Sequence, residues 1–381
     1  MEWKEVDICQ LCDSVSETYK GNASEVVLIN TSDVLDGKCL NHEYVPNKKL
    51  KGQFKKTFRK GDILYSEIRP ANKRFCFVDF EPKDYIASTK LMVLRAHEDV
   101  DPQYLYQILR SNDTLAQLQM LAESRSGTFP QITYSELSNI MVSLPSQKAQ
   151  KNIVSILSSL DRKIELNNKI NADLEEMAQA IFKNWFVDFE PFKNGKFVDS
   201  ELGMIPEGWK VGTLGELCNF KRGKNLLTKN AIDEGVPVVA GGLEPSCYHN
   251  VANTGAPVIT VSGSGANAGF MRMYHVPVWA SDCSFIDISC ENFYFVYCFL
   301  KVKSKLLKHA QTGAVQPHVK PSDIHDFELV IPDKESIYEF QDKVKPFFDK
   351  IALIQKENSR LSLLRDTLLP RLMSGELEVP E

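Results

Sequence analysis

Four short segments of the chain carry residue types whose spacing could support chemistry. Cys9 and Cys12 form a C-x-x-C pair, which is half of a zinc site, but no second pair and no histidine cluster stands at zinc spacing. The segment 262–269, SGSGANAG, could cradle a phosphate. Its glycines follow the spacing G-x-G-x-x-x-G, however, and the strand-like stretch FMRMYHVPVW comes next. We expect buried thiols at the first segment and a loop at the second.

The other two segments imitate catalytic motifs incompletely. Residues 101–104, DPQY, lack the second proline of the D-P-P-Y motif of adenine methyltransferases, and no glycine motif for S-adenosylmethionine precedes them. Asp62 with Glu81 and Lys83 resembles the D…E-x-K of nucleases, but a proline stands inside the motif. The seven histidines form no cluster, and there is no P-loop. The sequence therefore predicts a chain without a catalytic centre, metal or cofactor of its own.

The composition is that of a globular protein with more than one domain. A chain of 381 residues exceeds one ordinary core, and its 43% hydrophobic and 25% charged residues are typical of globular proteins. No apolar run could cross a bilayer, and no secretion signal is recognisable. The nine scattered cysteines favour reduced thiols in the cytoplasm. The formal charge is −5, but residues 47–60 hold seven Lys or Arg and no acid, a patch that is compatible with DNA binding.

The chain contains the same unit twice. One constant shift, without a gap, pairs Pro130 with Pro317, Pro145 with Pro332, Lys169 with Lys356, Asn171 with Asn358 and Leu174 with Leu361. A somewhat larger offset aligns YLYQIL with YFVYCFL and SRSGTFPQI with AQTGAVQPHV. A period of about two hundred residues is too long for a solenoid repeat. It indicates that a globular domain followed by a helix has been duplicated.

Each globular part is patterned mainly as β-structure. Short runs such as VVLINTSDV, DILYSEI and KLMVLRA alternate with turn residues, and PVVAGG, PVITVSG and SFIDIS repeat them. One helix is expected in each part, at 102–122 and at 291–309. We therefore predict an α+β fold. Its parts are a first domain at 1–145, a long helix at 146–187, a linker at 188–207, a second domain at 208–332, and a second long helix with the C-terminal tail at 333–381.

The two long helices carry matching apolar seams. In residues 153–185 and again in residues 340–372 the seam positions recur at alternating steps of four and three, which is the pattern of a coiled coil. Such a stripe must be buried, so we expect the helices to pair as an antiparallel coiled coil with pseudo-twofold symmetry. Pro346 is expected to kink the second helix or to mark its start, and Pro370 to end or bend it.

Asparagine interrupts both seams near the middle. Antiparallel packing, centre to centre, would place Asn167 near Asn358 and Asn171 near Ile354. A buried amide penalises slipped registers because a slip leaves it unpaired among leucines. We interpret these three asparagines as a register lock. The alternative is that they face solvent at the edge of the seam.

A duplicated β-rich domain and long helix without catalytic residues resembles the specificity (S) subunit of type I DNA restriction–modification enzymes. The resemblance lies in residues 144–192 around the first long helix, in LGMIPEGWKVGTLGEL at 202–217, and in LLPRLMSGEL at 368–377. Together with the repeat it covers essentially the whole chain. The helical motifs are specific, whereas the globular parts vary within the family.

The resemblance implies two target-recognition domains, each reading half of a bipartite, asymmetric sequence of double-stranded DNA in the cytoplasm of a prokaryote. The helices would be a spacer and a docking surface for two methyltransferase (M) subunits, and the complex would recruit restriction (R) subunits. S-adenosylmethionine would belong to the M subunit, and ATP and Mg to the R subunit. A coil of fixed register would set the spacing between the two half-sites.

Residues that contact DNA are expected in loops rich in Lys, Arg and polar side chains. In the first domain the expected phosphate ligands are Lys48, Lys49, Lys51, Lys55, Lys56 and Arg59. The residues expected nearer the bases are Arg69, Arg74, Arg125, Thr128 and Gln131. The candidates in the second domain are Lys221, Arg222, Lys224, Ser264, Asn267, Arg272, Gln316, His318 and Lys320. For any single lysine the alternative is a solvated surface charge.

Two other functions are alternatives to DNA recognition. A self-contained nuclease or methyltransferase would bind a metal or S-adenosylmethionine, and the missing motifs argue against it. A non-enzymatic scaffold would use its two domains to bind protein partners, and it would show no sequence-dependent retention of DNA.

Overall fold

The computed structural model describes residues 3–48, 52–124, 130–304, 307 and 318–379. The chain forms two compact units. The first consists of Met1–Glu165 and Ser359–Glu381, and the second of Leu166–Asn358. These units differ from the two sequence repeats, because each unit contains part of both long helices.

The first unit is built on two four-stranded sheets. Its strands are β1 Lys4–Asp7, β2 Cys12–Val15, β3 Glu25–Ile29, β4 Val34–Leu35, β5 Lys38–Cys39, β6 Val45–Pro46, β7 Phe54–Lys56, β8 Ile63–Ser66, β9 Phe75–Phe77, β10 Tyr85–Ser88, β11 Leu91–Ala96 and β12 Met141–Leu144. One sheet has the order β2-β11-β8-β9, and the other has the order β6-β3-β10-β7, in which β3 and β10 are parallel. β1 pairs with β12 and β4 with β5.

The sheet β2-β11-β8-β9 lies between two hydrophobic cores, because successive side chains of its central strands point to opposite faces. Leu64 of β8 and Val93 of β11 belong to the core between the two sheets. Tyr65 and Leu94, which point to the opposite face, belong to the core under the helices. These helices are α1 Pro102–Arg110, α2 Asn112–Ser124 and α3 Tyr134–Ser138.

The second unit has a corresponding set of strands. They are β13 Phe197–Val198, β14 Ile205–Pro206, β15 Lys210–Thr213, β16 Lys221–Arg222, β17 Val236–Val239, β18 Cys247–His249, β19 Val258–Ser262, β20 Met271–Tyr274, β21 Trp279–Ala280, β22 Cys283–Asp287 and β23 Glu328–Ile331. One sheet has the order β16-β22-β19-β20, and a second has the order β18-β17-β21, in which β17 and β21 are parallel. β13 pairs with β14 and β15 with β23. The short helices are α5 Phe293–Val302 and α7 Pro321–His325.

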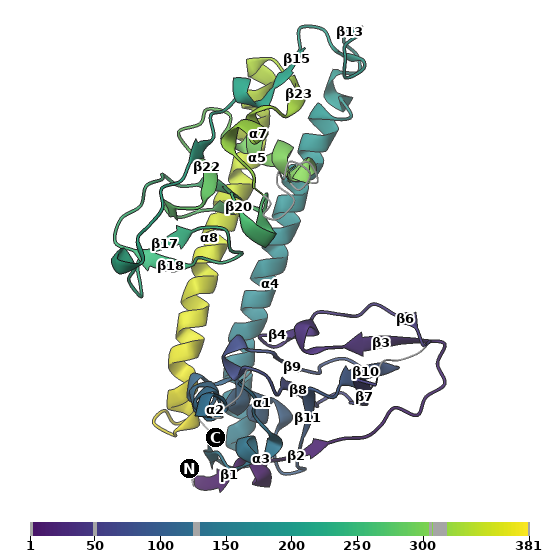
Figure 1. The fold of residues 1–381 in the computed structure, drawn as a ribbon, viewed down its shortest axis with the longest axis vertical. Coiled ribbons are helices and arrows are strands. Elements are labelled where there is room, and N and C mark those ends of the chain that lie inside the picture. The colour runs from purple at the N-terminus through teal and green to yellow at the C-terminus, as the bar shows by residue number, and fades with distance from the viewer. Residues whose placement is uncertain (1–2, 49–51, 125–129, 305–306, 308–317, 380–381) are drawn as a thin grey trace. The chain divides into compact units, whose positions relative to one another are not determined.

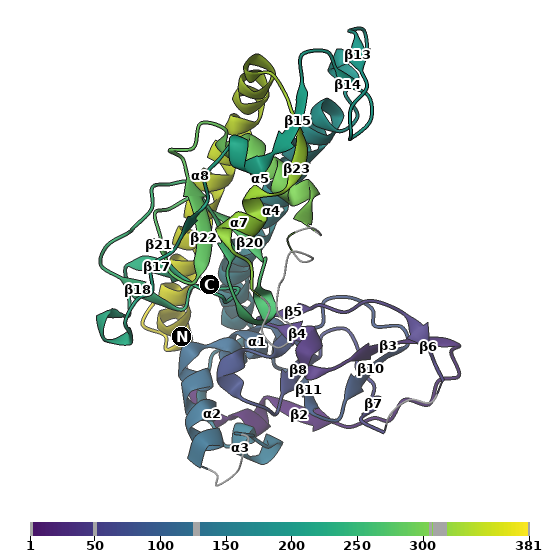
Figure 2. The same ribbon diagram turned by 45° about the horizontal axis from the view of Figure 1, so that its top comes forward.

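The two units share one four-stranded sheet and one terminal strand pair, which confirms the predicted duplication and the α+β fold. The order β16-β22-β19-β20 corresponds to β2-β11-β8-β9, and the terminal pair β15-β23 corresponds to β1-β12. The registers agree as well, since Ser262 pairs with Cys283 as Ser66 pairs with Leu91. Figures 1 and 2 show the two sets of strands, purple to blue in the first unit and green in the second.

The two long helices are α4 Gln147–Phe186 and α8 Lys334–Met373. Within each unit they lie side by side and antiparallel (Figures 1 and 2). Of the two alternatives for Pro346, a helix start is wrong, because α8 begins at Lys334, as the predicted boundary at 333 implies, and continues through both prolines. Pro370 stands in its last turn, so that the helix ends soon after it. No helix among the described residues combines the length and the apolarity needed to cross a bilayer.

The prediction of a single helix at 102–122 is also wrong, because two helices, α1 and α2, occupy these residues. Ser111 separates α1 from α2 with an extended backbone, at φ −62° and ψ 147°. Its hydroxyl accepts a hydrogen bond from the backbone N–H of Thr114 at 3.2 Å, which is the geometry of an N-cap. The pattern of apolar residues continues across this break, and only the capping residue marks it.

An aromatic core joins both long helices to the sheet layer of the second unit. Phe182 and Phe186 of α4 contact Phe340 of α8, with ring centroids 5.6 and 5.2 Å apart. Phe295 of α5 lies 5.0 Å from the ring of Phe186. All four side chains are almost completely buried, so the helices are part of the core of this unit.

Asparagines occupy the centre of the helix pair, inside the second unit. The Asn167 side chain is buried, and its Nδ2 donates to Asn358 Oδ1 and to Glu357 Oε2, both at 2.8 Å. Asn358 in turn donates to Asn168 Oδ1 at 2.9 Å. Asn167 and Asn358 are thus neighbours, as centre-to-centre packing requires. Asn171 is half-buried, and its Oδ1 has no hydrogen-bond partner among the described residues.

We expect Asn167→Leu to lower the free energy of unfolding by about 1–2 kcal/mol, because it removes the donor to Asn358 Oδ1 and Glu357 Oε2. The double variant Asn167→Leu/Asn358→Leu should recover this stability and lose the single register, giving more than one species. Urea unfolding and size-exclusion chromatography measure the two effects. A single variant that is both more stable than the parent and monodisperse would show that the asparagines do not select the register.

Candidate nucleic-acid interface

The segments that imitate catalytic motifs have structural roles. The expectation of buried thiols is wrong for Cys9, which is exposed, and is confirmed for Cys12, where burial raises the pKa of the thiol to about 12. Asp62 is buried and forms an ion pair with Arg95 at 2.8 Å. The Asp101 carboxylate accepts two backbone N–H bonds at the start of α1. Within the described part of the chain, no group of three His, Cys, Asp or Glu could hold a metal ion.

Two of the predicted DNA-contacting residues of the second unit, Arg222 and Ser264, bind one carboxylate, and a third, His318, is bridged to Ser264. Ser264, in the loop after β19, forms an isolated β-bridge with His318. The Ser264 hydroxyl donates to Asp282 Oδ2, and the guanidinium of Arg222 donates to Asp282 Oδ1 at 2.5 Å. We call Arg222, Ser264, Asp282 and His318 the Asp282 cluster. Residues that are far apart in the sequence thus form one polar surface at the end of the sheet.

The first unit has a polar cluster at the same place. Gln131 forms an isolated β-bridge with Ile68. The ammonium of Lys90 lies 3.6 Å from Glu67 Oε2 and donates to Gln131 Oε1 at 3.4 Å. We call Glu67, Lys90 and Gln131 the Lys90 cluster. It contains one of the residues predicted to lie near the bases.

The predicted phosphate ligands of the first unit fall into two groups. Those with exposed side chains are Lys48, Lys55 and Arg59. Lys56, in contrast, donates through Nζ to the backbone carbonyls of Thr89 and Leu91 at 3.2 and 2.8 Å, and burial lowers the pKa of its ammonium. Its contacts hold the strand ends on either side of Lys90. Lys49 and Lys51 lie outside the described residues.

Two arginines expected near the bases of the first unit have different surroundings. Arg69 is exposed, and its backbone N–H donates to the carbonyl of Pro130 at 3.1 Å, which places it beside the Lys90 cluster. Arg74 donates through Nη1 to the carbonyl of Ser32 at 3.1 Å, and this hydrogen bond stabilises the turn at Thr31–Asp33. The remaining candidates of this unit, Arg125 and Thr128, lie outside the described residues.

The other candidates of the second unit lie on several different segments. Those with exposed side chains are Lys221, Lys224 and Lys320. Asn267, in the loop after β19, donates to the carbonyl of Gly241, which follows β17, at 3.3 Å. Arg272 pairs with Glu244 at 3.1 Å. Gln316 lies outside the described residues.

Sequence reasoning missed the two residues on which these clusters are centred. Lys90 and Asp282 each stand immediately before a strand, β11 or β22. An alignment of KLMVLRA with DCSFIDIS would have placed them at the same position. The sequence signal for this equivalence is weak, because the two residues differ in type and have opposite charges.

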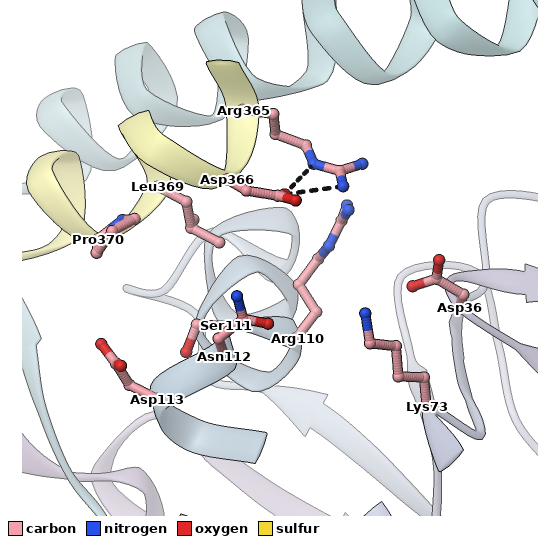
Figure 3. A pocket seen from close by; sticks show the side chains of 10 residues that line it. All are labelled: Asp36, Lys73, Arg110, Ser111, Asn112, Asp113, Arg365, Asp366, Leu369 and Pro370. Atoms are coloured by element: carbon pink, nitrogen blue, oxygen red, sulfur yellow. Dashed lines mark hydrogen bonds and ion pairs between the residues drawn. The ribbon is translucent and has the colours of Figure 1, made fainter. Parts of the chain in front are cut away.

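A further polar pocket lies where α1, α2 and α8 meet in the first unit (Figure 3). Arg110 and Arg365 both bind Asp161 of α4 at 2.9 Å, and Arg365 also pairs with Asp366. The cavity is small, at about 160 Å³, and it is lined by carboxylates as well as by cations. Because its arginines are paired with carboxylates, we assign the pocket to joining the helices and not to binding DNA.

The family model described as "Type I restriction modification DNA specificity domain" matches residues 2–176 and 206–363. The match covers each of the two repeats once. It therefore includes both polar clusters and most of both long helices.

Individual relatives extend over the same length. The HindI specificity subunit of a type I restriction enzyme from Haemophilus influenzae is 32% identical, over 99% of this chain and 100% of that protein. The MjaIX specificity subunit from Methanocaldococcus jannaschii is 29% identical, over 90% of this chain and 85% of its own. In fold, the chain resembles the crystal structure of a type I S subunit from M. genitalium, with a TM-score of 0.56, 18% identity, and coverage of 98% and 96%.

Proposed function

Because the chain belongs to the family of type I restriction–modification DNA specificity subunits, we propose that it selects the DNA sequence on which such a complex acts. Each unit would read one half of a bipartite target through the polar cluster at the end of its sheet. The chemical steps would be carried out by other subunits, with S-adenosylmethionine bound to the methyltransferase subunit and ATP and Mg bound to the restriction subunit. The complex would act on chromosomal DNA in the cytoplasm of a prokaryote.

One observation carries the proposal of a two-part, asymmetric target. The two units share one four-stranded sheet whose central strands pair in the same register, yet their clusters differ in chemistry. The first cluster is centred on the ammonium of Lys90, and the second on the carboxylate of Asp282. A shared scaffold gives both units the same way of meeting DNA, and different side chains at its edge select different bases.

The long helices support the proposal that two methyltransferase subunits bind. The duplication gives the chain two copies of any docking surface. Several large apolar side chains on the helices are exposed, among them Leu353, Leu363 and Tyr338. A contiguous exposed apolar patch marks a surface that binds another protein, and the proposal takes these side chains as parts of such a patch. Restriction subunits would join this assembly.

The test is the pattern of adenine methylation in the host genome. We expect a cell that makes this chain and its methyltransferase subunit to methylate one split motif at nearly every occurrence. Deleting the gene for this chain should remove that methylation completely, while the methyltransferase subunit is still made. If the motif stays methylated after the deletion, or if the purified complex binds DNA without sequence preference, a scaffold for protein partners would explain the chain better.

A further inference from the structure

Lys90 in the first unit and Asp282 in the second occupy the same position of the repeated fold. We propose that this position determines base specificity in each half-site, a proposal that rests on the function proposed above. Lys90 would act through its own ammonium, and Asp282 would act by positioning Arg222 and Ser264.

The equivalence of the two positions follows from the backbone. Lys90 directly precedes Leu91, which pairs with Ser66, and Asp282 directly precedes Cys283, which pairs with Ser262. The carbonyl of Lys90 accepts the backbone N–H of residue 67 at 3.1 Å, and the carbonyl of Asp282 accepts the N–H of residue 263 at 3.0 Å. The two residues are therefore equivalent: each directly precedes a strand, β11 or β22, that pairs with β8 or β19 in the same register.

A third segment reaches this place in both units. The bridge between Ile68 and Gln131 corresponds to the bridge between Ser264 and His318. In each unit the charged residue thus stands where the loop after the central strand meets the segment that leads to the next helix. Loops at the end of a rigid sheet are where binding residues are commonly placed, since the scaffold fixes them.

The side chains at this position differ in a way that core packing does not require. Lys90 is 50% exposed and Asp282 is 30% exposed, so neither charge fills the interior. Both side chains bind polar neighbours, but Lys90 carries a positive charge and Asp282 a negative charge. A contact that served only to hold the fold would have no reason to reverse its charge between two copies of one scaffold.

The two clusters offer different groups to a base edge. Around Lys90 the ammonium is a mobile donor beside the amide of Gln131, and it can reach an acceptor such as guanine O6 or thymine O4. Around Asp282 the exposed group is Arg222, which the carboxylate holds on one side. A guanidinium fixed in this way can donate two parallel hydrogen bonds to guanine.

The guanidinium of Arg222 lies directly against the backbone of residue 263. This residue is a glycine, and a Cβ there would overlap the guanidinium of Arg222. The corresponding residue in the first unit is Glu67, whose side chain instead reaches Lys90. The loop of the second unit is therefore shaped to let the arginine lie across it, which a merely solvated arginine would not need.

The experiment uses the complex with the methyltransferase subunit and determines the methylated motif for two variants. We expect Lys90→Gln to relax the base preference at one or more positions of one half-site by at least about tenfold, with the other half-site unchanged. Asp282→Asn should do the same in the other half-site only. The matched controls are Lys38→Gln and Asp233→Asn, which change exposed residues of the same units outside the clusters.

The outcomes separate this proposal from the function on which it rests. If the unaltered complex methylates no split motif, the proposed function fails. If the unaltered complex methylates one, and both variants co-purify with the methyltransferase subunit and leave both half-sites unchanged, only the role of this position is wrong. A variant that no longer assembles would point to a structural role and would also overturn it. Gly263→Ala gives an independent check, since displacing Arg222 should relax the same half-site as Asp282→Asn.

Discussion

Inserting seven residues into each long helix is expected to lengthen the spacer of the DNA target by about three base pairs, with both half-sites unchanged. The insertions belong between Glu165 and Leu166 in α4 and between Asn358 and Ser359 in α8, where the two compact units divide. Methylome sequencing of cells that carry the lengthened chain measures the new motif.

The expected size follows from helix geometry. Seven residues add about 10 Å of helix at 1.5 Å per residue, and a base pair occupies about 3.4 Å of the DNA axis. A heptad also returns the apolar stripe to nearly the same face, so both seams continue to match. The insertion therefore changes the length of the helix pair and preserves its packing.

The control is an insertion of two residues at the same place in α4 alone. This change turns the seam of α4 away from α8, and we expect loss of methylation and not a new spacer. If the paired heptad insertion changed the bases of a half-site and kept the spacing, the helices would be reading sequence. The assignment of recognition to the sheet clusters would then be wrong.

The duplication was predictable from the sequence because it leaves matching residues at a constant shift. Pro130 and Pro317, or Asn171 and Asn358, are visible without a structure. The apolar seams predicted that the two helices pair, and for the antiparallel sense that we expected the structure shows the contact between Asn167 and Asn358. Long periodic helices are the features that sequence patterns describe best, since their contacts repeat at fixed steps.

The features that sequence reasoning missed depend on single residues in context. Ser111 ends α1 through one hydrogen bond that the apolar pattern does not show. Pro346 stands inside α8 although proline removes a backbone donor there. Lys90 and Asp282 became candidates only when the strand registers placed them at one position. A cluster built from three segments far apart in sequence has no signature in any one of them.

Phe340→Ala is expected to lower the free energy of unfolding of the second unit by about 3–5 kcal/mol. The Phe340 side chain is 0% exposed and packs against Phe182 and Phe186 of the other long helix. Removing the ring leaves a cavity in the core that holds both helices to the sheet layer, and surrounding side chains can fill it only in part.

Urea unfolding followed by tryptophan fluorescence suits this measurement, because three of the four tryptophans, Trp185, Trp209 and Trp279, belong to the second unit. Tyr338→Ala on the same helix is the matched control, since its side chain is 71% exposed and its removal should cost little. If the two variants were equally stable, the buried aromatic cluster would not be what holds the long helices in this unit. A large loss for Phe340→Ala alone would mean that the proposed recognition and spacing depend on one core, because the helices that we propose set the spacing also complete the core of the second unit.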